Sequence, residues 1–196
     1  MNANMLGTLL LETLRRPDAV AARLMGLGIP VQTLWLGLIL VTVLNALSFA
    51  LSNILFPAPS PVPGLTDNPL IYAGVSGVVL LAIVFILTGT GRMLGGTAQL
   101  PDMLVLFVWL QFVGLVAQLA ILFVTLAIPV FGALLTLIFF AISFWITLHF
   151  ISAAHRFGSL SKAFGTLILT LVVLIIGTSL LLAIVGVTPE GLTQNV

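Results

Sequence analysis

The stretch that decides the fold runs from residue 103 to residue 154 and reads MLVLFVWLQFVGLVAQLAILFVTLAIPVFGALLTLIFFAISFWITLHFISAA. It contains no Asp, Glu, Lys or Arg, and it is far longer than the roughly 20 residues that one helix needs to cross a bilayer. Ile128-Pro129 divides it near the middle, where proline ends one helix and suits the first turn of the next. The stretch therefore predicts two membrane-spanning helices, over 103–127 and 130–152, joined by a very tight turn.

Three further apolar stretches flank this pair, over 33–55, 70–90 and 164–187, and each is long enough to cross a bilayer. Of the 196 residues, 61% are hydrophobic and only 6% are charged. A soluble domain carries roughly 25% charged residues. The sequence therefore predicts an all-α polytopic integral membrane protein, with a five-helix transmembrane domain over 31–188 and a short outer tail over 189–196.

All six basic residues fall on one side of this predicted topology. They lie before the first span, between the second and third, and between the fourth and fifth: Arg15, Arg16, Arg23, Arg92, Arg156 and Lys162. Lys and Arg near the ends of spans are retained in the cytoplasm. We therefore expect the N-terminus in the cytoplasm and the C-terminus outside.

The N-terminal segment, residues 1–30, is too often interrupted by polar side chains to cross a bilayer. Helical spacing of its apolar residues predicts two short amphipathic helices separated at Pro17. The apolar positions are Met5, Leu6, Leu9, Leu10 and Leu14, then Val20, Ala21, Leu24 and Met25. We expect Asp18 and Arg23 to face away from them. The pattern predicts helices that lie in the cytoplasmic interface of the membrane, with packing against the bundle as a cap as the alternative.

The acidic residues bear on which reactions are possible, because proton-coupled transport and acid–base catalysis need a carboxylate in a protected place. All five lie in predicted termini or loops: Glu12, Asp18, Asp67, Asp102 and Glu190. The chain has no Cys and only two His, which provides no ligand set for zinc. Six scattered basic residues also form no electrostatic footprint for nucleic acid. We therefore predict a protein that is not an enzyme, with no cofactor, no metal site and no nucleic-acid partner.

Polar residues within the predicted spans form two stripes. They recur at helical spacing on one face of the first span and one face of the third: Asn45, Ser48 and Ser52, then Gln111, Gly114 and Gln118. An amide exposed to hydrocarbon costs several kcal/mol unless it is hydrogen-bonded, so both stripes should face protein. Interhelical hydrogen bonding is one interpretation, and the lining of a narrow path for a small solute is the other.

A basic cluster is predicted at one depth on the cytoplasmic side, formed by Arg92, His155, Arg156 and Lys162. Such a cluster is able to hold the phosphate of a lipid headgroup through charge and the bidentate geometry of arginine. Membrane topology alone also demands basic residues at these positions. Lipid-phosphate contact is therefore one of two interpretations of the cluster.

The order of short motifs along the chain resembles the Yip-domain family. Arg16-Pro17 precedes five spans, GRMLGGT follows the second span at 91–97, and SLSKAF follows Trp145 at 159–164. The resemblance implies five-span topology and association with other membrane components. Eukaryotic members are named for interacting with Ypt/Rab GTPases and have long cytosolic N-terminal regions. This short chain looks like a bacterial member, which implies the bacterial inner membrane and does not carry over Rab binding.

Three functions remain open from the sequence. The first is an organising, accessory or assembly component that acts through helix–helix and lipid contacts, with membrane lipid and other integral membrane proteins or itself as partners. The second is a small-solute permease or channel that uses the polar stripes on spans one and three. The third is a membrane-shaping protein whose residues 4–28 insert into one leaflet.

Overall fold

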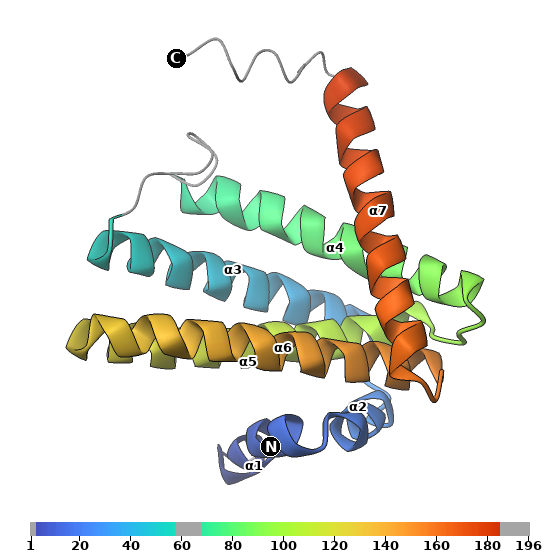
Figure 1. Ribbon diagram of the computed structural model, residues 1–196, viewed down its shortest axis with the longest axis horizontal. Coiled ribbons are helices and arrows are strands. Elements are labelled where there is room, and N and C mark those ends of the chain that lie inside the picture. Colours follow the sequence, from blue (N-terminus) through green and yellow to red (C-terminus); the bar gives the residue numbers. More distant parts are fainter. Residues whose placement is uncertain (1–2, 58–67, 185–196) are drawn as a thin grey trace.

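A computed structural model describes residues 3–57 and 68–184, and all regular structure in these residues is α-helical (Figure 1). The helices are α1 (Ala3–Arg15), α2 (Pro17–Met25), α3 (Val31–Leu55), α4 (Pro69–Met93), α5 (Leu100–Ala127), α6 (Pro129–His155) and α7 (Leu160–Ile184). Five of them, α3 to α7, are long and apolar enough to cross a membrane. The predicted all-α, five-span fold is therefore confirmed.

The long helices match the predicted spans closely and extend a few residues beyond them at one end of the bundle. We call this the basic end, because it contains Arg92, Arg156 and Lys162 at the α4–α5 and α6–α7 connections. Residues 185–187, predicted as the end of the last span, and the predicted tail over 189–196 lie outside the described residues.

The predicted tight turn between the third and fourth spans is confirmed. Ile128 alone separates α5 from α6, and Pro129 occupies the first turn of α6. Gly132 lies directly against Thr125, where a side chain would overlap the threonine. The missing side chain at Gly132 therefore lets the two helices approach closely after the turn.

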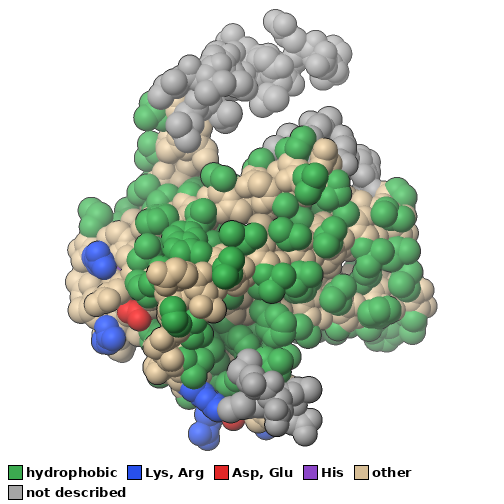
Figure 2. Space-filling model, turned by 180° about the vertical axis from the view of Figure 1, so that it is seen from behind, with side chains coloured by type: hydrophobic (Ala, Val, Ile, Leu, Met, Phe, Trp, Pro, Cys, Tyr) green, Lys and Arg blue, Asp and Glu red, His purple; other side chains and the backbone are tan. Residues whose placement is uncertain are grey.

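Helices α3, α4, α5 and α6 run side by side, with α3 packed on α4 and α5, and α6 packed on α5 (Figure 1). Large side chains that are fully buried gather in the half of the bundle nearer the basic end, among them Leu87, Met103, Leu104, Ile146, Phe150 and Ile151. Hydrophobic side chains are spread across the face seen in Figure 2, and the charged ones lie at its margins. A lipid environment accepts such a surface, whereas water does not.

Helix α7 does not run alongside the other four. It begins at the end of α6 and crosses α4, and its C-terminal half then leaves the bundle (Figure 1). The crossing is fixed by a hydrogen bond of 2.8 Å between the Thr90 and Thr170 hydroxyls, and Ala163 and Thr166 are fully buried beside it. The sequence predicts the existence of this helix but not its direction.

Helices α1 and α2 are amphipathic, as predicted, and pack on α5 and α6. Buried residues on their shared face are Leu9, Thr13, Val20, Ala21 and Leu24. The Trp109 indole N–H in α5 donates to the Thr13 hydroxyl at 3.0 Å. Protein therefore covers most of this apolar face, which favours the cap arrangement, and placement in the membrane interface stays a prediction.

Candidate functional site

The two predicted polar stripes meet at Asn45. Its side-chain amide donates to the carbonyl oxygen of Val41 in its own helix at 2.7 Å and to that of Gln111 in α5 at 3.4 Å. The Asn45 amide is therefore hydrogen-bonded within α3, and it also links the first span to the third. This contact supports the interpretation of Asn45 as an interhelical hydrogen-bonding residue.

The two serines of the first stripe differ in the hydrogen bonding of their hydroxyl groups. Ser52 donates to the Ser48 carbonyl at 3.0 Å. Among the described residues, the Ser48 hydroxyl is one of the buried polar atoms that have no hydrogen-bond partner, and Thr42 Oγ1 is another. The methyl group of Thr42 faces Gly77 of α4, where an added Cβ would approach it to 3.3 Å. Small and hydroxyl side chains on this face thus let α3 and α4 pack closely.

Gln111 itself points into a cavity of about 430 Å³ between α4, α5 and α6, which we call the Gln111 groove. Four polar residues line it: Ser76 of α4, Gln111 of α5, and Ser143 and Thr147 of α6. Ser76 donates to the Ala73 carbonyl at 3.2 Å, and Thr147 donates to the Ser143 carbonyl at 2.7 Å. These two hydroxyls are satisfied within their own helices.

The amide of Gln111 differs from those hydroxyls, because no described residue hydrogen-bonds with it. Gly114 lies on the same face of α5 and leaves open space where a side chain would stand. Gln118 lies further along α5 and is not among the residues that line the groove. The predicted stripe on the third span therefore divides, and only Gln111 and Gly114 share a cavity.

At the basic end, the imidazole of His155 is buried to 1% exposure between the end of α4 and the α4–α5 connection. Gly91 and Gly96 both face this ring, and a Cβ at either position would overlap it. The His155 Nε2–H donates to the Leu87 carbonyl at 3.2 Å, and the Thr97 amide donates to the His155 carbonyl at 3.2 Å. We call this arrangement the His155 clasp.

The basic residues around the clasp differ in what they offer to a ligand. Arg92 donates through Nε to the Ala98 carbonyl at 2.9 Å, and Arg156 donates to the Thr97 hydroxyl at 3.0 Å. Both side chains and that of Lys162 are exposed. His155 is instead enclosed by protein, so its ring does not face the surface. Lipid-phosphate contact through Arg92, Arg156 and Lys162 stays a prediction.

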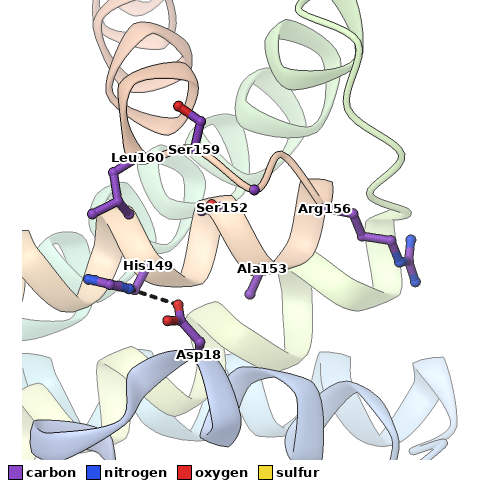
Figure 3. Close-up of a pocket in the computed structure, with 8 residues that line it drawn as sticks. Asp18, His149, Ser152, Ala153, Arg156, Ser159 and Leu160 are labelled. Atoms are coloured by element: carbon purple, nitrogen blue, oxygen red, sulfur yellow. Dashed lines mark hydrogen bonds and ion pairs between the residues drawn. The ribbon is translucent and has the colours of Figure 1, made fainter.

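A second polar contact joins α2 to α6 at the edge of a cavity of about 390 Å³ (Figure 3). His149 Nδ1 lies 2.8 Å from Asp18 Oδ1, and the two side chains are 16% and 63% exposed. Asp18 is exposed, as expected for a residue off the apolar face of α2, and its carboxylate also reaches His149 of α6, a contact that the sequence did not predict. Arg156 also borders this cavity, but its guanidinium turns away toward Thr97 (Figure 3).

Among residues 3–57 and 68–184, no three His, Cys, Asp or Glu side chains gather closely enough to hold a metal ion. The described residues instead present three features of the helices: the Gln111 groove, the His155 clasp and the half of α7 that projects from the bundle.

Comparison with known protein families shows which family has this architecture. The profile of the Yip1 domain matches residues 11–181, which is most of the chain. The chain belongs to the Yip1 domain family. No curated protein and no solved structure matches it. The GRMLGGT motif, on which the resemblance partly rests, has a structural role in this chain, since its Gly91, Gly96 and Thr97 hold His155.

Sequence reasoning missed the roles of His155 and His149. A histidine next to the charged end of an apolar span is expected at the surface, and nothing local indicates that two glycines more than fifty residues earlier enclose its ring. The spacing of Gly91 and Gly96 was the available signal, because glycines near a helix end permit close approach of another segment.

Replacing Gly91 with Ala tests the His155 clasp. The added methyl group would overlap the buried imidazole, so we expect the free energy of unfolding to fall by about 1–3 kcal/mol. The measurement is the thermal unfolding midpoint of the purified protein in detergent. Gly89→Ala is the matched control in the same helix, since open space surrounds that position. Equal midpoints for the two variants would contradict the clasp.

Replacing Asp18 with Asn tests whether the contact with His149 holds α2 on the bundle. We expect roughly two- to fivefold faster tryptic cleavage at Arg15 and Arg23, because local opening exposes these sites and a half-exposed pair contributes modestly. The control is Glu12→Gln, which removes the 3.6 Å ion pair of Glu12 with Arg23 and leaves the α6 contact intact. Cleavage at the wild-type rate in the Asp18 variant would show that the pair does not hold α2.

Proposed function

We propose that this Yip1 domain protein is a non-enzymatic organising component of a membrane, which binds a further membrane-embedded helix in the Gln111 groove. The observation that carries the proposal is the amide of Gln111, which hydrogen-bonds with no described residue and lines an open cavity about three turns into a span. Elsewhere in the described spans, hydroxyl side chains mostly donate to carbonyls of their own helices. The groove therefore contains an unsatisfied group that protein contact would satisfy.

Energetics favour a helix as the occupant of the groove. A polar group left unpaired in hydrocarbon costs roughly 2–7 kcal/mol, and lipid tails offer no hydrogen-bonding atoms. A second helix with a hydroxyl or a carbonyl at the right depth supplies a partner for Gln111, at roughly 0.6–2 kcal/mol per interhelical bond. Gly114 adds space for close approach of that helix.

The proposed setting is the inner membrane of a bacterium, with the N-terminus and the basic end in the cytoplasm. Sorting of all six Lys and Arg residues to one side of the topology supports this orientation. At that end Arg92, Arg156 and Lys162 are exposed and would meet anionic headgroups. Lipid contact at the basic end and helix contact in the groove then act at different depths.

The polar lining of the Gln111 groove also favours a second candidate, a small-solute permease. Its path would differ from the one predicted between spans one and three, since Asn45 bridges those spans and Gln111 lines a cavity on the side of α4 and α6. A permease predicts solute flux into proteoliposomes that Gln111→Leu abolishes, whereas an organising component has no flux to lose.

The proposal is tested by placing a photo-cross-linking amino acid at Ser143 in the groove and irradiating native membranes. We expect an adduct with a membrane protein, and at least several-fold less of it when Gln111→Leu is added, because the interhelical bond is lost. Leu36, exposed on α3, provides the control position and should give lipid adducts. Lipid adducts alone at Ser143, or a protein adduct unaffected by Gln111→Leu, would overturn the proposal.

A further inference from the structure

A further cavity, of about 340 Å³, lies between α1, α5 and α6, and we call it the α1 cavity. It shares Val113 and Phe139 with the Gln111 groove but lies on the side of α1. Every side chain that lines it is apolar, and those nearest its rim include Leu10, Leu11 and Leu14 of α1. The α1 cavity therefore offers no hydrogen-bonding side chain to an occupant.

The chemistry of this lining limits what fills the α1 cavity. Ordered water needs roughly two to four polar partners, and these side chains provide none. An empty cavity would leave its lining without van der Waals contacts on one side. The cavity is too small to enclose a further helix, since a 16 Å length of helix about 10 Å wide occupies about 1,200 Å³. A flexible hydrocarbon chain meets all three conditions.

The α1 cavity has the length and direction of one lipid chain. Along α5 it extends from Val113 to Val124, a rise of about 16 Å. Half of the hydrocarbon core of a bilayer is about 15 Å thick. Because α5 begins at the basic end, the cavity runs from that side toward the opposite end of the bundle. It therefore matches an acyl chain whose headgroup lies on the side of the basic end.

Unpaired positive charge lies where such a headgroup would be. Trp109, one turn before the cavity begins on α5, donates to the Thr13 hydroxyl at 3.0 Å, which places the end of α1 there. Arg15 follows Leu11 by one helical turn, so the two side chains share a face of α1, and Leu11 is 60% exposed at the cavity. Arg15 and Arg16 are exposed, and their side chains have no ion-pair or hydrogen-bonding partner among the described residues.

We propose that the α1 cavity holds one acyl chain of an anionic phospholipid, whose phosphate is bound by Arg15 and Arg16. A guanidinium donates two parallel N–H bonds to phosphate oxygens, so arginine suits this contact. The chain alone gives little preference, because lipid tails are as apolar as the cavity walls. Selectivity therefore resides in the headgroup. Gln111 does not line this cavity, so the site is independent of the proposed function.

Photo-cross-linking in vesicles of defined composition tests the site. The purified full-length chain is reconstituted in phosphatidylcholine with a minor fraction of phosphatidylglycerol that carries a diazirine in one acyl chain. We expect adducts concentrated in residues 113–124 and 135–142. Ala117→Phe fills the cavity and should reduce them several-fold. Ala141→Phe adds the same bulk to an exposed position of α6 outside the cavity and should leave them unchanged.

Arg15→Gln tests the headgroup contact. We expect about fivefold less labelling by the phosphatidylglycerol probe, which is the effect of one basic residue on an anionic lipid. Labelling by a phosphatidylcholine probe with the same diazirine chain should be weaker in the wild type and unchanged in the variant. The matched control is Lys162→Gln, which removes one exposed positive charge at the basic end and away from the cavity.

Three results would overturn the proposal. The first is labelling spread evenly over the lipid-facing surfaces of α3 to α7. The second is equal labelling of the cavity in wild type and Ala117→Phe. The third is equal labelling by the phosphatidylglycerol and phosphatidylcholine probes. Because Arg15 is exposed, Arg15→Gln leaves the fold intact, so the headgroup comparison decides the matter even if Ala117→Phe does not fold.

Discussion

The contact between the His155 ring and the two glycines beside it determines how the basic end of the molecule is built. The ring fills the space that side chains at Gly91 and Gly96 would otherwise occupy. It thereby fixes the end of α4, the connection to α5 and the end of α6 relative to one another. The next residue, Arg156, adopts the left-handed conformation with φ of 55°, which ends α6 and directs the chain into α7.

Satisfaction of hydrogen bonds in hydrocarbon explains most of the polar residues in the bundle. Thr88, Thr125 and Thr136 donate to carbonyls one turn earlier, so their hydroxyls need no partner helix. Asn45 combines such a local bond with a bond to α5. Gln111 departs from this pattern, because its amide has no described partner and lines a cavity. The hydroxyls of Ser48 and Thr42 also lack a described partner, but both are buried, whereas Gln111 lies at an open groove.

The fold was largely predictable because its signals are local in the sequence. Ile128-Pro129 marks the turn between α5 and α6, and the apolar stretches delimit the five long helices to within a turn at nearly every end. The site was predictable in part. Gln111 was identified from helical spacing, but the neighbours that form its groove, Ser76 and Ser143, come from other helices.

The sequence did not predict the direction of α7 or the contacts between residues that are far apart in the chain. The large apolar residues of α7 are spread around its circumference, so they do not indicate the direction in which the helix leaves the basic end. The burial of His155 depends on glycines in another helix, and the orientation of Asp18 depends on His149 in α6. These three features share one physical cause: the deciding partner is remote in sequence.

The His155 clasp and the Thr90–Thr170 contact together direct α7 away from its own bundle. The most direct measurement is the distance between spin labels on cysteines introduced at Leu70 and Leu180, in labelled chains diluted with unlabelled ones so that only intrachain distances count. Both side chains are well exposed. With α7 crossing α4 at Thr170, we expect a distance of about 30 Å or more from helix lengths alone. A distance of about 15–20 Å, expected if α7 lay alongside α4 with Thr170 still at the level of Thr90, would contradict it.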